Sequence, residues 1–146
     1  MIRPLKQLDE DFIYHSWIHS VKCPTKAVSS MTRAVIDHTV ENGGVQVFCM
    51  PDDPDHIIGW VARGDLEETP LLLYLFVKKD FRKEGIGTEL LNAAFPERVL
   101  DGETVFSCYW SYHMQKMDAR KRWGVKFVSN LLPAHIYTLM SQKDAA

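Results

Sequence analysis

Four residues, Arg82, Lys83, Gly85 and Gly87, lie between a run of apolar residues and a segment with a helical pattern. Their types suit the binding of an anion. Backbone N–H groups at a helix start have no intrahelical partner, and the helix dipole adds positive charge there. Glycine lets a ligand approach the main chain closely. A pyrophosphate matches several converging N–H donors, so this corner is either a phosphate site or a simple turn with charged side chains.

Two familiar phosphate-binding motifs are absent from the sequence. A P-loop needs Gly-Lys-Ser or Gly-Lys-Thr, which does not occur, and Leu90 stands where a dinucleotide-binding fingerprint needs its third glycine. A Gly-x-Gly pair alone favours the simple turn. The strand before it, the helix after it and the order of elements along the chain together favour the anion site.

The elements that position this corner are read from the apolar periodicity. Strands are expected at residues 2–5, 45–50, 56–63, 71–78 and 104–110, and in the segments 125–132 and 135–140. Helices are expected from Asp9 to the Cys23-Pro24 pair, from Thr25 or Ser29 to Asn42, from Gly85 to near Pro96, and over residues 114–123. Turns or loops are expected at residues 51–55 and 64–70. This order predicts one mixed α/β (α+β) domain over residues 1–146.

Composition narrows the classes of function. The net charge of −2 and the lack of a basic aromatic platform argue against a nucleic-acid binder. The sequence has no apolar run of membrane-spanning length and no signal-peptide core, so no membrane partner is expected. The three cysteines are far apart and form no Cys-x-x-Cys, which favours reduced thiols and a cytoplasmic location.

Residues 82–87, Arg-Lys-Glu-Gly-Ile-Gly, match the signature [QR]-x-x-G-x-[GA] of the GCN5-related N-acetyltransferases. "VKKDF" before it and "TELL" after it resemble the same family segment. The order of elements resembles that family's fold over nearly the full chain, and "RWGVKFV" resembles its closing helix-to-strand turn. The opening "IRPL...DEDFIYHSWIHS" also resembles small acetyltransferase-like proteins encoded by tailed phages.

This resemblance implies a mostly antiparallel central sheet flanked by helices, with a splayed strand pair that takes acyl-coenzyme A. It implies acetyl-CoA as the cofactor, with main-chain groups of Phe76 and Val77 on the pantetheine arm and Arg82 close to the pyrophosphate. The amides expected to cradle the pyrophosphate are those of Lys83, Glu84, Gly85, Ile86, Gly87 and Thr88. Glu84 departs from many relatives, which carry a basic or neutral residue there, so its carboxylate must point outward to leave binding intact.

The reaction that the resemblance implies is direct attack of an amine on the thioester, assisted by a base or a water relay. The Val77 N–H could stabilise the charge on the thioester oxygen. Relatives often supply a proton-donating tyrosine four residues before the closing glycine, but Arg120 stands there. The donor is then Tyr112, His113 or a water, although a histidine at a helix start is more often a partly exposed surface residue.

Other titratable residues have simpler interpretations. Asp65, Glu67 and Glu68 are candidates for the base, but carboxylates in a surface loop are usually only solvated. His15 and His19 have a metal-binding spacing without an obvious third ligand, so no metal site is predicted. Cys108 is interpreted as a small buried residue.

The sequence therefore predicts an N-acetyltransferase that transfers an acetyl group from acetyl-CoA to a primary amine of a small molecule or protein. The alternative is a catalytically degenerate protein of the same fold with a binding or structural role, for example in a phage virion. The partners expected are acyl-CoA and an amine acceptor, and the chain could be a monomer or a homodimer.

Overall fold

The computed structural model describes residues 1–20, 25–99, 105–107 and 125–127. The helices described are α1 (Glu10–Ser20), α2 (Lys26–Glu41), α3 (Ile86–Ala94) and the short α4 (Pro96–Val99), with 3-10 turns η1 (Gln7–Asp9) and η2 (Lys79–Phe81). The strands described are β1 (Ile2–Pro4), β2 (Val45–Met50), β3 (Asp53–Leu66), β4 (Thr69–Val77), β5 (Val105–Ser107) and β6 (Val125–Phe127).

The strands form one six-stranded sheet in which the spatial order follows the order in the sequence. The pairs from β1 to β4 are antiparallel, whereas β4 pairs with β5, and β5 with β6, in parallel. The predicted class, a mixed and mostly antiparallel sheet flanked by helices, is confirmed.

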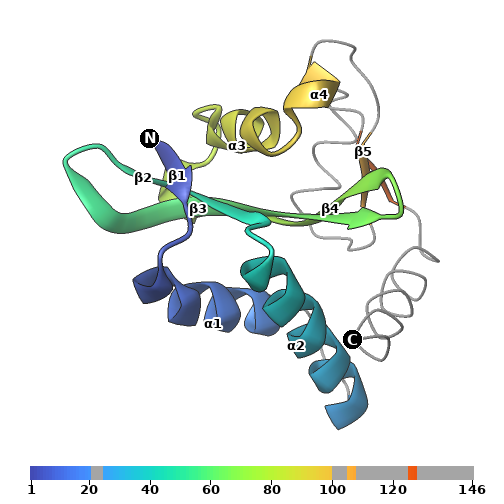
Figure 1. Cartoon of the computed structure of the whole chain (residues 1–146). Helices are drawn as coiled ribbons and strands as arrows, with labels where there is room; N and C mark the ends of the chain where they lie inside the picture. Colours follow the sequence, from blue (N-terminus) through green and yellow to red (C-terminus); the bar gives the residue numbers. More distant parts are fainter. Residues whose placement is uncertain (21–24, 100–104, 108–124, 128–146) are drawn as a thin grey trace.

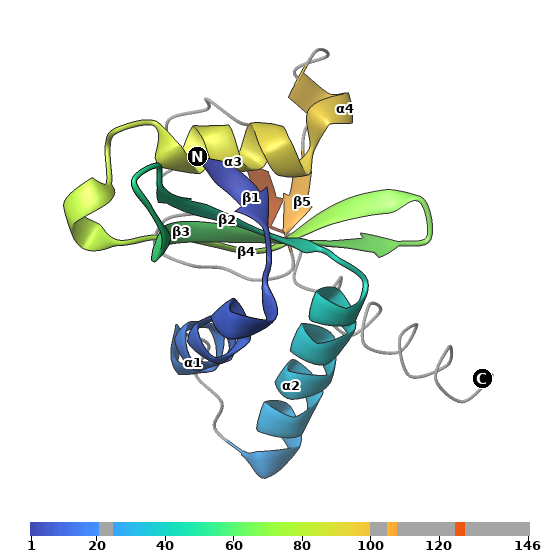
Figure 2. The ribbon, with the colours of Figure 1, turned by 60° about the vertical axis from the view of Figure 1, so that its left-hand side comes forward.

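Helices cover both faces of the sheet. Figures 1 and 2 show α3 and α4 on one face and α1 and α2 on the other. β4 is therefore buried along almost its whole length, which explains why its sequence lacks polar alternation. On the α1 and α2 face, the ring of Trp17 stacks on that of Tyr74, with centroids 5.8 Å apart, and Trp60 stacks on Tyr74 at 4.9 Å. The apolar side chains thus form two core clusters, one on each face.

A β-bulge interrupts β4 in its middle. Ala62 pairs with Tyr74, but the next residue, Arg63, pairs with Leu72, so Leu73 is the extra residue. The side chains of Leu73 and Tyr74 consequently pack in the same cluster, on the α1 and α2 face. Leu72 is also the last residue of β4 whose pairing with β5 is described. Because a bulge bends its strand and increases the local twist, it changes the course of β4 just beyond this pairing.

Two predicted loops are shorter in the structure. β3 begins at Asp53 and β4 at Thr69, so the expected turn over residues 51–55 and the expected loop over residues 64–70 are wrong at their edges. Asp65 pairs with Pro70 and Leu66 with Thr69, which leaves a tight turn at Glu67 and Glu68. Glu67 has a φ of 58°. The sequence predicts a polar loop here and not this hairpin, because Glu67 occupies the left-handed turn position that usually carries glycine or asparagine.

The other predicted elements agree with the structure within a few residues where the chain is described. The first strand ends one residue early, at Pro4, and α3 ends at Ala94, ahead of Pro96. Of the strands expected over residues 104–110 and 125–132, the structure describes residues 105–107 as β5 and residues 125–127 as β6. The helix expected over residues 114–123 and the strand expected over residues 135–140 lie outside the described residues.

A partly buried ion pair fixes the amino-terminal end of the chain, and we call Arg3, Asp9 and the Pro54 carbonyl the amino-terminal clamp. Arg3 Nη1 lies 2.6 Å from Asp9 Oδ2, and Arg3 Nη2 donates to Asp9 Oδ1 at 3.0 Å. The Pro54 carbonyl accepts from Arg3 Nη2 at 2.8 Å, and the Lys6 N–H donates to Asp9 Oδ2 at 2.7 Å. The clamp therefore ties β1 and η1, which leads into α1, to the β2–β3 hairpin.

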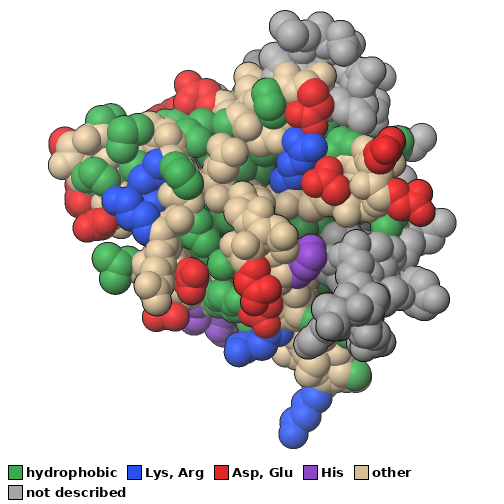
Figure 3. Space-filling model, in the orientation of Figure 1, with side chains coloured by type: hydrophobic (Ala, Val, Ile, Leu, Met, Phe, Trp, Pro, Cys, Tyr) green, Lys and Arg blue, Asp and Glu red, His purple; other side chains and the backbone are tan. Residues whose placement is uncertain are grey.

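The described surface carries charges of both signs. Figure 3 shows Lys and Arg side chains interspersed with Asp and Glu side chains on the face that it displays. This distribution agrees with the net charge of −2 and gives that face no broad basic field. Among the helices that the structure describes, none is both long and apolar enough to cross a bilayer.

Candidate functional site

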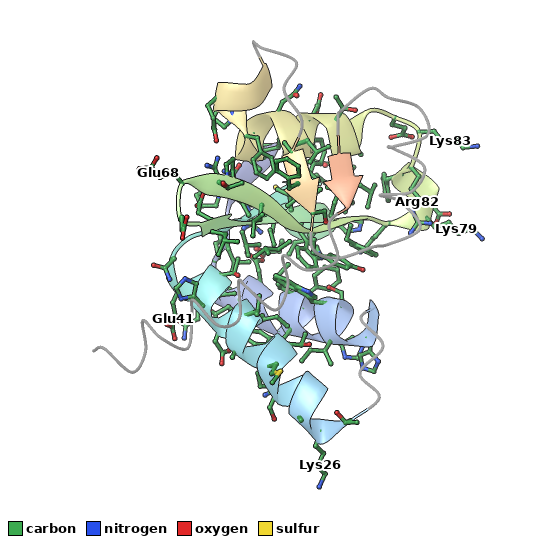
Figure 4. The ribbon with its side chains drawn as sticks, turned by 90° about the vertical axis from the view of Figure 1, so that its right-hand side faces the viewer. Lys26, Glu41, Glu68, Lys79, Arg82 and Lys83 are labelled. Carbon is green, nitrogen blue, oxygen red and sulfur yellow. The ribbon has the colours of Figure 1, made fainter. Side chains whose placement is uncertain are left out.

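The corner predicted to bind an anion lies where β4 ends and α3 begins. β4 ends at Val77, η2 follows, and residues 82–85 lead into the first turn of α3. Figure 4 shows Lys79, Arg82 and Lys83 together at one end of the molecule, with Lys79 and Lys83 pointing outward. The strand, turn and helix that the sequence predicts here are all present.

The backbone of this turn visits the left-handed region twice. Lys83 has a φ of 70° and Gly85 a φ of 83°. Glycine adopts this conformation freely, whereas a residue with a Cβ does so at a cost. Alternation of left-handed and right-handed residues turns successive N–H groups toward one side, which produces an anion-binding concavity.

The amino end of α3 has no side-chain cap. Gly85 occupies the N-cap position, and no side chain donates or accepts a capping hydrogen bond there. The Glu89 N–H makes the first hydrogen bond of the helical type, to the Gly85 carbonyl at 3.0 Å. The N–H groups of Ile86, Gly87 and Thr88 consequently have no intrahelical partner, and they add to the positive end of the helix dipole.

The two glycines of the corner serve different purposes. Gly85 has open space around the position of a Cβ, so its positive φ is what requires glycine. At Gly87, a Cβ would lie 3.8 Å from Leu75 Cδ2 and 4.0 Å from Val77 Cγ2, which are ordinary contact distances. The fold therefore requires glycine at residue 85 and accepts a methyl group at residue 87.

Arg82 is tied to the strand end. Its Nε donates a hydrogen bond to the Val77 carbonyl at 2.8 Å, and the side chain is half-buried. This contact could not be predicted from the sequence, because the signature implies a position for Arg82 near the ligand and says nothing of its partner within the protein.

The hydrogen-bond pattern sets the direction of the Val77 main chain. The Lys78 N–H donates to the Ile58 carbonyl on β3 at 2.8 Å. Because successive residues of a strand point their N–H and C=O groups to opposite sides, those of Val77 point away from β3, toward the side where β5 lies. Phe76, which pairs with Trp60, turns its main chain toward β3. Of Phe76 and Val77, whose main chains are predicted to contact the pantetheine arm, Val77 is the one with its N–H and C=O turned away from β3, and both contacts stay predictions.

Charged side chains of the corner are mostly at the surface. Lys79, Lys83 and Glu84 are exposed, and Glu84 takes part in no ion pair with the described residues. The carboxylate of Glu84 is therefore solvated, as the sequence requires if an anion is to bind beside it.

A second arginine, which the sequence did not single out, holds the other end of α3. Arg63 on β3 donates from Nη1 to the Ala94 carbonyl at 2.8 Å and lies 2.7 Å from Glu97 Oε1. Its guanidinium also lies 5.1 Å from the centroid of the Phe95 ring. A cation at the carboxyl end of a helix complements the helix dipole. Arg63 thus fixes the helix whose amino end forms the corner.

The carboxylates considered as bases lie at the opposite end of β4. Asp65, Glu67 and Glu68 are exposed at the β3–β4 turn, and Figure 4 shows Glu68 far from Arg82. The strand rise separates Thr69 from Val77 by roughly 26 Å. These positions favour the interpretation of the three residues as surface carboxylates, and Asp65 in addition pairs with Arg63, whose Nη2 lies 3.3 Å from Asp65 Oδ1.

The remaining candidates lie on α1 or outside the described residues. The rings of His15 and His19 are exposed with centroids 4.2 Å apart, and the described residues contain no group of three metal-binding side chains. Tyr112, His113, Cys108 and Arg120 lie outside the described residues, so the predicted proton donors stay predictions.

Solved structures of acetyltransferases resemble this fold. AAC(6')-Iy in complex with the bisubstrate analogue CoA-S-monomethyl-acetylneamine has a TM-score of 0.55 at 15% identity, over 84% of this chain and 89% of that chain. A GCN5-related N-acetyltransferase from Ralstonia eutropha JMP134 has a TM-score of 0.55 at 18% identity, over 84% and 91%. At these identities the likeness shows the fold.

Some similar structures are larger than the part that the chain matches. The chain spans 34% of a putative acetyltransferase from Pyrococcus horikoshii and 65% of the matched chain of the NatC complex bound to Gag peptide and CoA. A comparison of the sequence with curated proteins gives no match.

The family is shown by the sequence itself. The model of the acetyltransferase (GNAT) domain matches residues 43–125, which is more than half of the 146 residues. The matched region includes the whole corner from the end of β4 to the start of α3. The chain therefore belongs to the GNAT acetyltransferase family.

Proposed function

We propose that the protein is an N-acetyltransferase that moves an acetyl group from acetyl-CoA to a primary amine of a small molecule or protein. The observation that carries the proposal is the corner between β4 and α3, in which an uncapped helix start follows a turn with two left-handed residues. Family membership supports the acetyl donor. We propose that residues 1–146 act as a single domain of this kind.

The residues present at the corner fit coenzyme A. The N–H groups of residues 83–88 offer convergent donors to the pyrophosphate, and no capping side chain competes for the helix start. The Val77 main chain, turned away from β3, is the proposed contact for the pantetheine arm. When acetyl-CoA is bound, it supplies the activated acetyl group.

The chain must then stabilise charge and move protons. The Val77 N–H is the proposed donor to the thioester oxygen, on which charge develops as the amine attacks. An unprotonated amine is needed for the attack, so the rate should rise with pH through the pKa of the group that removes its proton. Tyr112 and His113 are the proposed donors to the departing thiolate, shared with water because Arg120 replaces the tyrosine of many relatives.

A panel of amines tests the proposal. Titration calorimetry should show binding of CoA, and release of the CoA thiol from acetyl-CoA should depend on an added amine and on pH. Changing Tyr112 to Phe, or His113 to Ala, should each lower turnover by less than about a hundredfold, since neither supplies the whole proton transfer. A thousandfold loss from one of these changes would identify a single essential acid.

A second function is favoured by two departures from the family pattern. Arg120 stands where relatives often carry a tyrosine, and Glu84 lies within the phosphate cradle. These departures suit a protein that has kept the fold and lost catalysis, with a binding or structural role. CoA binding without thiol release across a broad amine panel would support this second function, and no CoA binding at millimolar concentration would remove the first.

A further inference from the structure

The contact between Arg82 and Val77 suggests a role for the arginine that its charge does not explain. Nε is the only atom of the Arg82 side chain that makes a hydrogen bond with the described residues, and it donates to the Val77 carbonyl at 2.8 Å. A side chain placed only to attract an anion would have no need for this bond. The bond instead links the turn back to the end of the strand from which it departs.

This hydrogen bond belongs to a short chain of bonds across the sheet. The Val77 carbonyl and the Lys78 N–H are the two ends of one peptide unit. Arg82 Nε donates to that carbonyl, and the Lys78 N–H donates to the Ile58 carbonyl on β3 at 2.8 Å. Hydrogen bonds in series polarise one another, and a charged donor makes the stronger bond. Arg82 therefore holds one peptide plane in a fixed orientation at the end of β4.

We infer that Arg82 is a positioning residue, which orients the end of β4 through an N–H on the atom bonded to Cδ. The inference rests on the proposed function, because the oriented strand end is the proposed contact for the pantetheine arm and the thioester oxygen. Arg82 acts there through Val77 and needs no contact with the acetyl group.

Covalent structure makes the inference testable. Glutamine carries an amide nitrogen on Cδ, at the position of the arginine Nε, so Arg82→Gln keeps the donor and removes the charge. Lysine carries a methylene group at that position, so Arg82→Lys keeps the charge and loses the donor there. A positioning role thus predicts that Arg82→Lys impairs the protein more than Arg82→Gln does. A purely electrostatic role predicts that Arg82→Gln impairs it more. Lys79→Gln is the matched control, because Lys79 is exposed in the same turn and lies outside the cradle.

The first measurement is hydrogen exchange of the Lys78 amide by NMR in the protein without any cofactor. Arg82→Lys should speed exchange by about tenfold or more, because the peptide plane opens more often, and Arg82→Gln should change it by less than about threefold. Arg82→Met, which lacks both donor and charge, should behave as Arg82→Lys does. The Lys79→Gln control should leave exchange unchanged. This measurement does not depend on CoA binding or on activity.

The second measurement uses acetyl-pantetheine, an acetyl donor without phosphate groups, beside acetyl-CoA. Arg82→Lys should lower kcat/KM with acetyl-pantetheine by about tenfold, and Arg82→Gln by less than about threefold. A residue that acts only on the pyrophosphate would leave the rate with acetyl-pantetheine unchanged in both variants.

The outcomes separate this inference from the proposed function. Faster Lys78 exchange in Arg82→Lys than in Arg82→Gln supports it, and the reverse order, or equal behaviour of the two variants, overturns it. If the unmodified protein neither binds CoA nor releases thiol, the proposed function fails, while the exchange data still decide whether Arg82 positions the strand end.

Discussion

Arg3 and Arg82 both donate to main-chain carbonyls, as Arg63 also does, and the surroundings of the first two differ. In the amino-terminal clamp, Arg3 donates from Nη2 to Pro54 and to Asp9 and from Nη1 to Asp9 and Pro4, so the guanidinium is bonded on all sides. At the corner, Arg82 bonds through Nε alone within the described part of the chain.

The difference extends to the backbone and the acids nearby. Asp9 is 5% exposed and accepts from Arg3 and from the Lys6 N–H. The corner has the opposite character, because its helix start is uncapped and its acidic residue, Glu84, is exposed. A polar cluster whose donors all have hydrogen-bond partners stabilises the fold, whereas a cluster with unpaired N–H donors can bind an anion. The clamp is therefore expected to stabilise the fold, and the spare donors of the corner suit the anion binding proposed for it.

Breaking the clamp should have the largest effect on stability. Arg3→Ala leaves the Asp9 carboxylate without its charged partner, although the Lys6 N–H still donates to it, and should lower the free energy of unfolding by about 2 to 3 kcal/mol. Urea denaturation measures this loss. Arg33→Ala, which removes an exposed arginine on α2, is the control and should cost less than about 1 kcal/mol. An Arg3→Ala loss as small as that of the control would contradict the comparison.

Acid should weaken the same clamp. Hydrogen bonds from Arg3 outweigh the effect of burial and hold the pKa of Asp9 below its ordinary value. A group with a lowered pKa in the folded state adds stability above its unfolded pKa, roughly 3.9, and loses that contribution as the pH falls through the folded pKa. Stability should therefore fall below about pH 4. Asp9→Asn should show a shallower fall in urea denaturation from neutral to acidic pH, and an equally steep fall would assign the acid sensitivity to other groups.

The two glycines of the corner allow a test on a smaller scale. Gly85→Ala forces a Cβ into the left-handed region, at a cost of about 1 to 2 kcal/mol, and it should weaken CoA binding because the turn must change shape. Gly87→Ala fits among ordinary contacts and should raise stability by up to about 1 kcal/mol. Thermal unfolding and calorimetry check both variants. Equal CoA affinities for the two would mean that the left-handed turn does not shape the site.

The sequence was sufficient to predict the corner because local physics determines it. The apolar run of β4, the glycine at residue 85 and the helical pattern after it each act over a few residues. The signature [QR]-x-x-G-x-[GA] has a physical basis in the structure, since Gly85 has a positive φ and Gly87 has room for a methyl group. Arginine and glutamine, the alternatives at its first position, share an N–H on the atom bonded to Cδ.

Contacts across the fold could not be predicted in this way. Arg3 meets Pro54, and Arg63 meets Ala94, only after the sheet and helices have assembled. The bulge at Leu73 gives no sequence signal, because a continuous apolar strand looks the same with or without an extra residue. The β3–β4 turn could not be predicted for a local reason, because Glu67 takes a turn position that usually carries glycine or asparagine.

The smallest expected effect concerns Glu84. It tests whether this carboxylate leaves the N–H donors of the corner available to an anion. The carboxylate is exposed and outside any ion pair with the described residues, so water and salt screen it from a bound pyrophosphate. Glu84→Gln should therefore change the affinity for CoA by no more than a few-fold in calorimetry. Asp80→Asn, an exposed acid in η2, is the matched control and should behave alike. A gain of tenfold or more for Glu84→Gln alone, worth about 1.4 kcal/mol, would show that the carboxylate turns toward the pyrophosphate and opposes it. That result would remove the contrast with the clamp, because the corner would then hold an acid that competes with the ligand for the same donors.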